Sequence, residues 1–127
     1  TPLWMAAQEG HVQIVQTLLT RDDIDVNKPR TTDGCTPLYI AAQEGHVQIV
    51  QTLLTRDDID VNKHSNQDAT PLFIASIQGK VEVVRLLLSQ PNIDINKLTT
   101  RGDSALGMAT QYNHTEVVQL LTEAGAQ

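Results

Sequence analysis

The chain contains the same 23-residue sequence twice. AAQEGHVQIVQTLLTRDDIDVNK occupies residues 6–28 and returns unchanged at residues 41–63. Four related hexapeptides also recur at intervals of 35, 34 and 34 residues: TPLWMA (1–6), TPLYIA (36–41), TPLFIA (70–75) and SALGMA (104–109). A fixed period of this size indicates an array of stacked repeats. We therefore expect a single repeat domain that spans the 127 residues, with units at about 1–35, 36–69, 70–103 and 104–127.

Each unit contains the signals of two short helices. Thr36 stands before Pro37, and this pair suits a helix start, because the hydroxyl caps free amides and proline fits the first helical position. Gly45 is expected to end that helix in the left-handed conformation. A second helix is predicted from about His46 to Thr55, and its apolar stripe is too wide for a helix with one buried side. Each unit should therefore be a helix pair with a projecting turn, and it needs neighbours to bury its apolar faces.

The combined pattern T-P-L-x-x-A, A-x-x-G-H, V-x-x-L-L and D-V-N resembles the ankyrin repeat. The resemblance implies an all-α fold class, an α-solenoid of stacked helix-turn-helix units with short β-hairpin fingers. The histidine of the family's T-P-L-H is replaced here by Trp4, Tyr39, Phe73 and Gly107. We interpret the three rings as packing groups, with an exposed binding stripe as the alternative.

Composition narrows the classes of partner. The net charge is −6, and nine Lys and Arg are scattered among fifteen Asp and Glu, which disfavours nucleic-acid binding. No apolar run approaches the roughly 20 residues of a membrane span, so we predict no membrane insertion. The one cysteine, Cys35, fits a reducing compartment. We expect an intracellular, cytoplasmic location, and a nuclear one is compatible.

One short motif has the spacing of a metal loop. Asp23, Asp25 and Asn27 are placed like the first oxygen ligands of a calcium-binding loop. Such a loop needs Gly at its sixth position and Glu at its twelfth, where this chain has Lys28 and Gly34. We therefore predict no metal site. We interpret the Asp and Asn residues as groups that terminate the helix pair and bond to the finger backbone.

The histidines carry no catalytic pattern. His11 and His46 recur with the repeat, and Lys80 takes their place in the third unit, so we expect them to bond to neighbouring backbone. No cysteine or carboxylate is spaced with them as a zinc set or a triad. We predict no catalytic residue, no cofactor and no enzyme activity.

The resemblance implies a protein-interaction module. Related proteins bind other proteins through the finger tips and the concave face of the first helices. Projected onto this chain, that surface holds sixteen residues: Gln8, Glu9, Thr32, Asp33, Cys35, Gln43, Glu44, Asn66, Gln67, Ala69, Ile77, Gln78, Arg101, Asp103, Gln111 and Tyr112. Two alternatives stay open, a regulatory or targeting segment of a larger enzyme or channel, and an engineered or structural solenoid without a natural partner.

The outer units differ in character. The first unit has the same sequence as an interior unit and lacks the polar outer face of a terminal cap. The last unit has a more polar second helix. We expect the chain to be a piece of a longer array, or one whose N-terminal part is missing.

Overall fold

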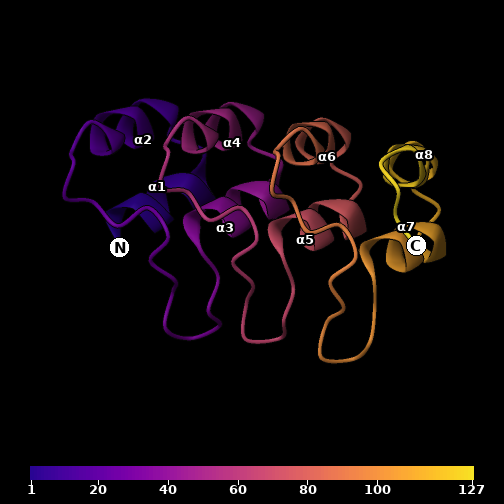
Figure 1. Ribbon diagram of the computed structural model, residues 1–127. Helices are drawn as coiled ribbons and strands as arrows, with labels where there is room; N and C mark the ends of the chain where they lie inside the picture. Colours follow the sequence, from indigo (N-terminus) through magenta and orange to yellow (C-terminus); the bar gives the residue numbers. More distant parts are fainter.

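The computed structural model describes residues 1–127, which form helices and loops without strands. The helices lie in two rows: the first helix of every unit in one row, the second in the other, with loops projecting from the first row (Figure 1). We call the units repeats 1 to 4. Their helix pairs are α1 (Pro2–Glu9) and α2 (Val12–Leu19), α3 (Pro37–Glu44) and α4 (Val47–Leu54), α5 (Pro71–Ile77) and α6 (Val81–Leu88), and α7 (Ala105–Gln111) and α8 (Thr115–Glu123). The all-α prediction is confirmed.

The first helix of each repeat starts at the hydroxyl that the sequence indicates. Thr1, Thr36 and Thr70 each accept a hydrogen bond at 3.1 Å from the backbone N–H three residues on. Ser104 does the same at 2.9 Å, although no proline follows it. Caps of this kind contribute about 1 kcal/mol each, so the start of every repeat is fixed locally.

The turn between paired helices is built around a residue with positive φ. Gly10 has φ +80° and Gly79 φ +68°, which suits glycine. A Cβ atom at Gly10 would lie 2.9 Å from the ring of His46, and one at Gly79 would lie 2.7 Å from the ring of His114. Glycine is therefore required at these turns for two reasons: the backbone is left-handed, and the imidazole of the next repeat leaves no room for a side chain.

Those imidazoles bond to backbone in the preceding repeat, as predicted. His46 Nε2 donates to the carbonyl of Gln8 at 2.9 Å, and His114 Nε2 donates to the carbonyl of Ile77 at 3.0 Å. Both acceptors lie in the last turn of a first helix, where carbonyls lack partners inside the helix. The histidines thus connect consecutive repeats.

The loop asparagines also connect repeats: they were expected to bond to the finger backbone, and they bond to the loop that precedes the next finger. Asn27 Nδ2 donates to the carbonyl of Asp58 at 2.7 Å, and Asn27 Oδ1 accepts from the N–H of Asp60 at 2.8 Å. Asn62 makes the same two bonds to Asn92 and Asp94. Each asparagine therefore bridges two backbone groups in the loop of the following repeat.

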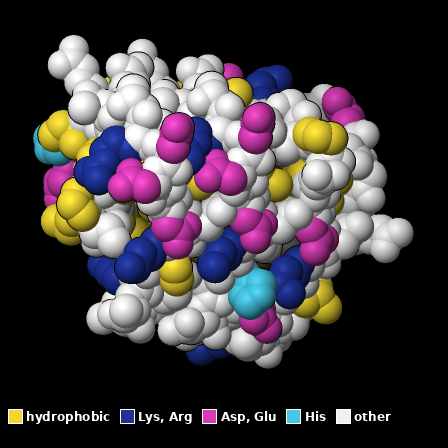
Figure 2. All heavy atoms as spheres, turned by 60° about the vertical axis from the view of Figure 1, so that its left-hand side comes forward, with side chains coloured by type: hydrophobic (Ala, Val, Ile, Leu, Met, Phe, Trp, Pro, Cys, Tyr) yellow, Lys and Arg dark blue, Asp and Glu magenta, His cyan; other side chains and the backbone are white.

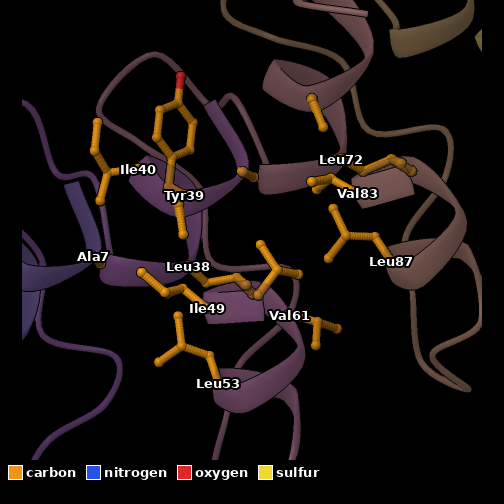
Figure 3. Packing of buried hydrophobic residues seen from close by; sticks show 14 of the residues in the cluster. Ala7, Leu38, Tyr39, Ile40, Ile49, Leu53, Val61, Leu72, Val83 and Leu87 are labelled. Carbon is orange, nitrogen blue, oxygen red and sulfur yellow. The ribbon is translucent and has the colours of Figure 1, made fainter. Parts of the chain in front are cut away.

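One hydrophobic cluster runs through the whole stack and includes Trp4, Tyr39 and Phe73, so the packing interpretation of the rings is confirmed. Leu38, Ile49 and Leu53 come from repeat 2, and Leu72, Val83 and Leu87 from repeat 3; all are buried in this cluster (Figure 3). Small residues lie between the first helices, since Ala7, Ala41, Ala42, Ala75 and Ala109 are fully buried. The core is therefore shared between repeats rather than enclosed within any one of them.

Leu53→Ala tests this assignment. Leu53 is fully buried, so its truncation should lower the free energy of unfolding by about 2–5 kcal/mol, measured by urea denaturation. Leu18 occupies the position of the first copy that matches Leu53, but it is only partly buried. Leu18→Ala is therefore the matched control and should lower the free energy of unfolding by less. A loss under about 0.5 kcal/mol for Leu53→Ala would contradict the helix register.

Candidate protein-binding surface

Three loops, here called finger 1 (residues 29–35), finger 2 (64–69) and finger 3 (98–103), project beside the row of first helices (Figure 1). Each is closed by a backbone hydrogen bond, such as the one from Ser65 N to the carbonyl of Ala69 at 2.9 Å in finger 2. Neighbouring fingers are also joined, because Asn66 N donates to the carbonyl of Asp33 and Thr100 N to that of Gln67. The expected short hairpins are thus turns without strands, held in a row.

A hollow of about 370 Å³ lies where fingers 2 and 3 meet the first helices of repeats 2 to 4. Four of its apolar lining residues, here called its floor, come from α5 and from α7 with its C-cap: Phe73, Ile77, Met108 and Tyr112. The rest of its wall is mainly polar, and consists of Tyr39, Ser65, Gln67, Ala69, Thr99, Thr100, Arg101 and Asp103. We call this hollow the finger groove. It combines an apolar surface with nearby hydrogen-bonding groups, the usual composition of a recognition site.

Six of the residues expected to contact a partner line the finger groove. They are Gln67, Ala69, Ile77, Arg101, Asp103 and Tyr112. The other ten lie outside it, on finger 1, at the tip of finger 2 or near the ends of the first helices: Gln8, Glu9, Thr32, Asp33, Cys35, Gln43, Glu44, Asn66, Gln78 and Gln111. The structure therefore gathers the members from fingers 2 and 3 together with Ile77 and Tyr112, and leaves the others spread along the stack.

Cys35 and Ala69 have little exposed surface among the expected contact residues, at 7% and 6%. Both side chains are buried, because each stands just before a helix cap, where the finger re-enters the core. The carbonyl of Cys35 also accepts a hydrogen bond from Nε1 of Trp4 at 2.9 Å. Cys35 therefore offers no side-chain surface, and Ala69 contributes only a small part of the groove wall.

Several residues of the groove could not be predicted from the sequence. Phe73 and Tyr39 were interpreted as packing groups, with a binding stripe as the alternative, and both line the groove although their side chains are buried. Met108 and the pair Thr99 and Thr100 were not considered. Met108 occupies the same position of the recurring hexapeptide as Ile74 in the preceding repeat, and this match could have indicated it. Its exposure, however, depends on the neighbouring finger.

The chain was then compared with known proteins. The family model described as ankyrin repeats (3 copies) matches residues 1–65 and, again, residues 58–127. The chain belongs to the ankyrin repeat family. Ankyrin repeats are generally protein–protein interaction modules and are typically non-catalytic. A comparison with curated proteins finds no match.

The charged groups of this ankyrin array are interleaved. Figure 2 brings the N-terminal end of the stack forward and shows Lys and Arg side chains alternating with Asp and Glu, without a continuous basic patch. Arg21 and Asp23 pair at 3.3 Å, and Arg56 and Asp58 pair at 2.9 Å in the corresponding loop of the next repeat. None of the helices has the length and apolar character to cross a bilayer. No three His, Cys, Asp or Glu side chains are grouped to hold a metal ion.

Finger 1 of the ankyrin array is stiffened by a small polar cluster. The guanidinium of Arg30 lies over the ring of Trp4, 4.0 Å from its centroid, and pairs with the carboxylate of Asp33. Asp33 Oδ1 also accepts from the backbone N–H of Cys35 at 3.1 Å. The hydrogen bond from Arg30 is the main reason that the pKa of Asp33 falls to about 2. The ion pair therefore closes the finger on itself, and the stacked guanidinium holds the finger against Trp4 of α1.

The same cluster makes the thiol of Cys35 unreactive. Burial, reinforced by the neighbouring carboxylate of Asp33, raises the pKa of Cys35 to about 12. Burial likewise raises the pKa of Tyr39 to about 12. Because the thiolate is the nucleophilic form of cysteine, Cys35 is inert near neutral pH.

The titration of Asp33 tests this cluster. Its pKa is lowered in the folded state from the ordinary 3.8 to about 2, so the folded state gains stability above the ordinary pKa and loses it as the pH falls toward 2. Arg30→Ala should return the pKa of Asp33 toward its ordinary value, as followed by NMR of the carboxyl carbon. Arg21→Ala is the control, because Arg21 pairs with Asp23 instead. A midpoint near pH 4 for Asp33 in the unchanged chain would contradict the ion pair.

Proposed function

We propose that this ankyrin array binds a partner protein through the finger groove, without catalysing a reaction. The observation that carries the proposal is the hollow of about 370 Å³ in which an apolar floor meets polar fingers. Tyr112 is 53% exposed and forms part of that floor, although large apolar side chains elsewhere in the array are mostly covered. An exposed aromatic residue in a concave site is a common anchor of protein interfaces.

The composition of the groove suggests what a partner presents. Phe73, Ile77, Met108 and Tyr112 favour one or two apolar side chains of the partner. Arg101 and Asp103, on finger 3, offer opposite charges at the rim, so the adjoining partner residues should be polar and not of a single sign. A short extended segment or a helix edge with an apolar anchor satisfies both conditions.

The links between repeats support binding by a preformed surface. Finger 2 is joined to finger 1 at 2.9 Å and to finger 3 at 3.0 Å through backbone hydrogen bonds. The carbonyl of Ile77, a floor residue, accepts from His114 of the next repeat at 3.0 Å. A groove held in this way loses little conformational entropy when a partner binds, which favours affinity.

Two histidines and the one cysteine have structural roles, which supports a non-catalytic function. His46 and His114 hold the stack together through backbone carbonyls, and Cys35 is buried with a raised pKa. A single unpaired cysteine also suits a reducing environment, so we place the protein inside the cell.

Tyr112→Asp is the sharpest test of the groove. It should weaken partner binding about 30-fold or more, because truncation of an interface hot spot costs about 2 kcal/mol or more. Leu98→Asp is the matched control: Leu98 is equally exposed, at 53%, but does not line the groove. Proteins captured from the source cell by the unchanged chain are identified by mass spectrometry, and the Kd of each purified candidate is measured by calorimetry with all three chains.

Two readouts make this test decisive. Circular dichroism and the Tm should be nearly the same for the two variants, because both positions are solvent-exposed. If a captured partner binds the Tyr112→Asp chain as tightly as the unchanged chain, the finger groove is not its binding site.

A further inference from the structure

The three aromatic rings that follow the helix caps differ in their polar atoms. Trp4, Tyr39 and Phe73 occupy the same position of the recurring hexapeptide, and all three are buried. The indole N–H of Trp4 donates to the carbonyl of Cys35 at 2.9 Å, so its donor is satisfied inside the chain. The ring of Phe73 has no polar atom. The hydroxyl of Tyr39 is the remaining donor of the series.

The hydroxyl of Tyr39 opens into the finger groove. Tyr39 is 8% exposed and belongs to the groove wall. Every fully covered side-chain nitrogen and oxygen of the chain has a hydrogen-bond partner. No hydrogen bond of ordinary geometry joins the Tyr39 hydroxyl to another group, so its oxygen is not fully covered. Figure 3 shows the ring standing away from Leu38 and Ile49, with the oxygen at its far end.

Ser65 is the polar side chain that acts on this hydroxyl, and it acts as a donor. Its oxygen accepts from the N–H of Gln67 at 3.2 Å and from the N–H of Ala69 at 3.4 Å, which occupies both lone pairs. Ser65 therefore has only a proton to offer to Tyr39, and this has a small lowering effect on the pKa of the tyrosine. The proton of Tyr39 has no acceptor within the chain.

The surroundings keep this donor protonated and favour an uncharged acceptor. Burial is the main reason that the pKa of Tyr39 is raised to about 12, so the hydroxyl keeps its proton near neutral pH. The carboxylate of Asp33 adds to the rise, so the tyrosine oxygen lies in a negative potential. A carboxylate acceptor would meet the same repulsion, whereas an amide oxygen has no net charge. On the groove wall, the charge of Asp103 is balanced by that of Arg101.

We propose that Tyr39 selects the partners of the finger groove by donating a hydrogen bond to an amide oxygen beside the partner's apolar anchor. This inference rests on the proposed function and names the chemistry that the partner presents. A main-chain carbonyl and the side chain of Asn or Gln both supply such an oxygen. A segment without one would cover the hydroxyl and leave it unpaired, which is unfavourable for a buried donor.

The order of the repeats fixes where the two features of the partner lie. Tyr39 is on α3, whereas the floor of the groove comes from α5 and from α7 with its C-cap. Helix α5 packs between α3 and α7. The acceptor oxygen of the partner therefore lies toward repeat 2, and its apolar anchor lies toward repeats 3 and 4.

Tyr39→Phe removes the donor and keeps the ring. Phe73 shows that phenylalanine fills this position of the repeat, so circular dichroism and the Tm should be nearly unchanged. The probes are peptides selected from a phage-displayed random library on the unchanged chain and synthesised with amidated C-termini. Those whose binding is weakened by Tyr112→Asp are kept as ligands of the groove. Tyr39→Phe should raise their Kd about tenfold by calorimetry, because the peptide oxygen loses its donor.

Changes in the peptide locate the acceptor. Each Asn or Gln is replaced by Leu, and each main-chain amide in turn by an ester, whose carbonyl accepts more weakly. One of these changes should weaken binding to the unchanged chain. The Tyr39→Phe chain should bind that altered peptide as well as the unchanged chain does or better, because no buried donor is left unpaired. Tyr112→Phe is the matched control: Tyr112 is exposed, so loss of its hydroxyl should change the Kd less than about twofold.

The outcomes separate this inference from the proposed function. Equal Kd values for the unchanged and Tyr39→Phe chains, with peptides that Tyr112→Asp weakens, would overturn the role of Tyr39 and leave the finger groove in place. Equal losses for Tyr39→Phe and Tyr112→Phe would also overturn it. Coupling of Tyr39 to an Asp or Glu of the peptide would contradict the choice of an amide oxygen. If Tyr112→Asp weakens none of the selected peptides, the proposed function itself is contradicted.

Discussion

The whole structure depends on contact between consecutive repeats. The first helices approach closely because fully buried alanines, such as Ala7, Ala42 and Ala75, lie between them. The leucines and isoleucines of each second helix then fill the space between neighbouring pairs. No repeat encloses a core of its own, so the hydrophobic effect acts across repeat boundaries and not within a unit.

Hydrophobic contact alone does not fix how far one repeat is shifted against the next, and here polar groups fix it. Histidine, asparagine and arginine side chains of one repeat bond to backbone groups of the neighbour, at Gln8, Asp58 and Leu19 among others. Most of these acceptors are carbonyls at helix ends or in loops, where no helical partner exists. The same bonds satisfy otherwise unpaired backbone and set the register. Backbone hydrogen bonds between neighbouring fingers then hold the row that frames the finger groove.

The fold could be predicted because each of its signals is local. A hydroxyl before proline, a glycine eight or nine residues later and an apolar stripe specify a helix pair within one repeat. The surface was harder to predict, because its properties depend on residues about 30 positions apart. Cys35 is buried against Trp4 of the preceding repeat, and Met108 reaches the groove only beside finger 3. The bonds of the asparagines between repeats were not predicted for the same reason, since their acceptors lie in the following repeat.

The copied segment separates the parts of the sequence that build the stack from those that can distinguish partners. Residues that are identical in both copies perform the same packing in both, and their exposure differs only through what covers them. The fingers, in contrast, read PRTTDGC, HSNQDA and LTTRGD and share little beyond their polarity. Because the finger groove is walled by two consecutive fingers, its chemistry is set by a pair of unlike sequences held at a fixed spacing. Copying a repeat therefore preserves the spacing, and changing one finger alters the site without disturbing the core that supports it.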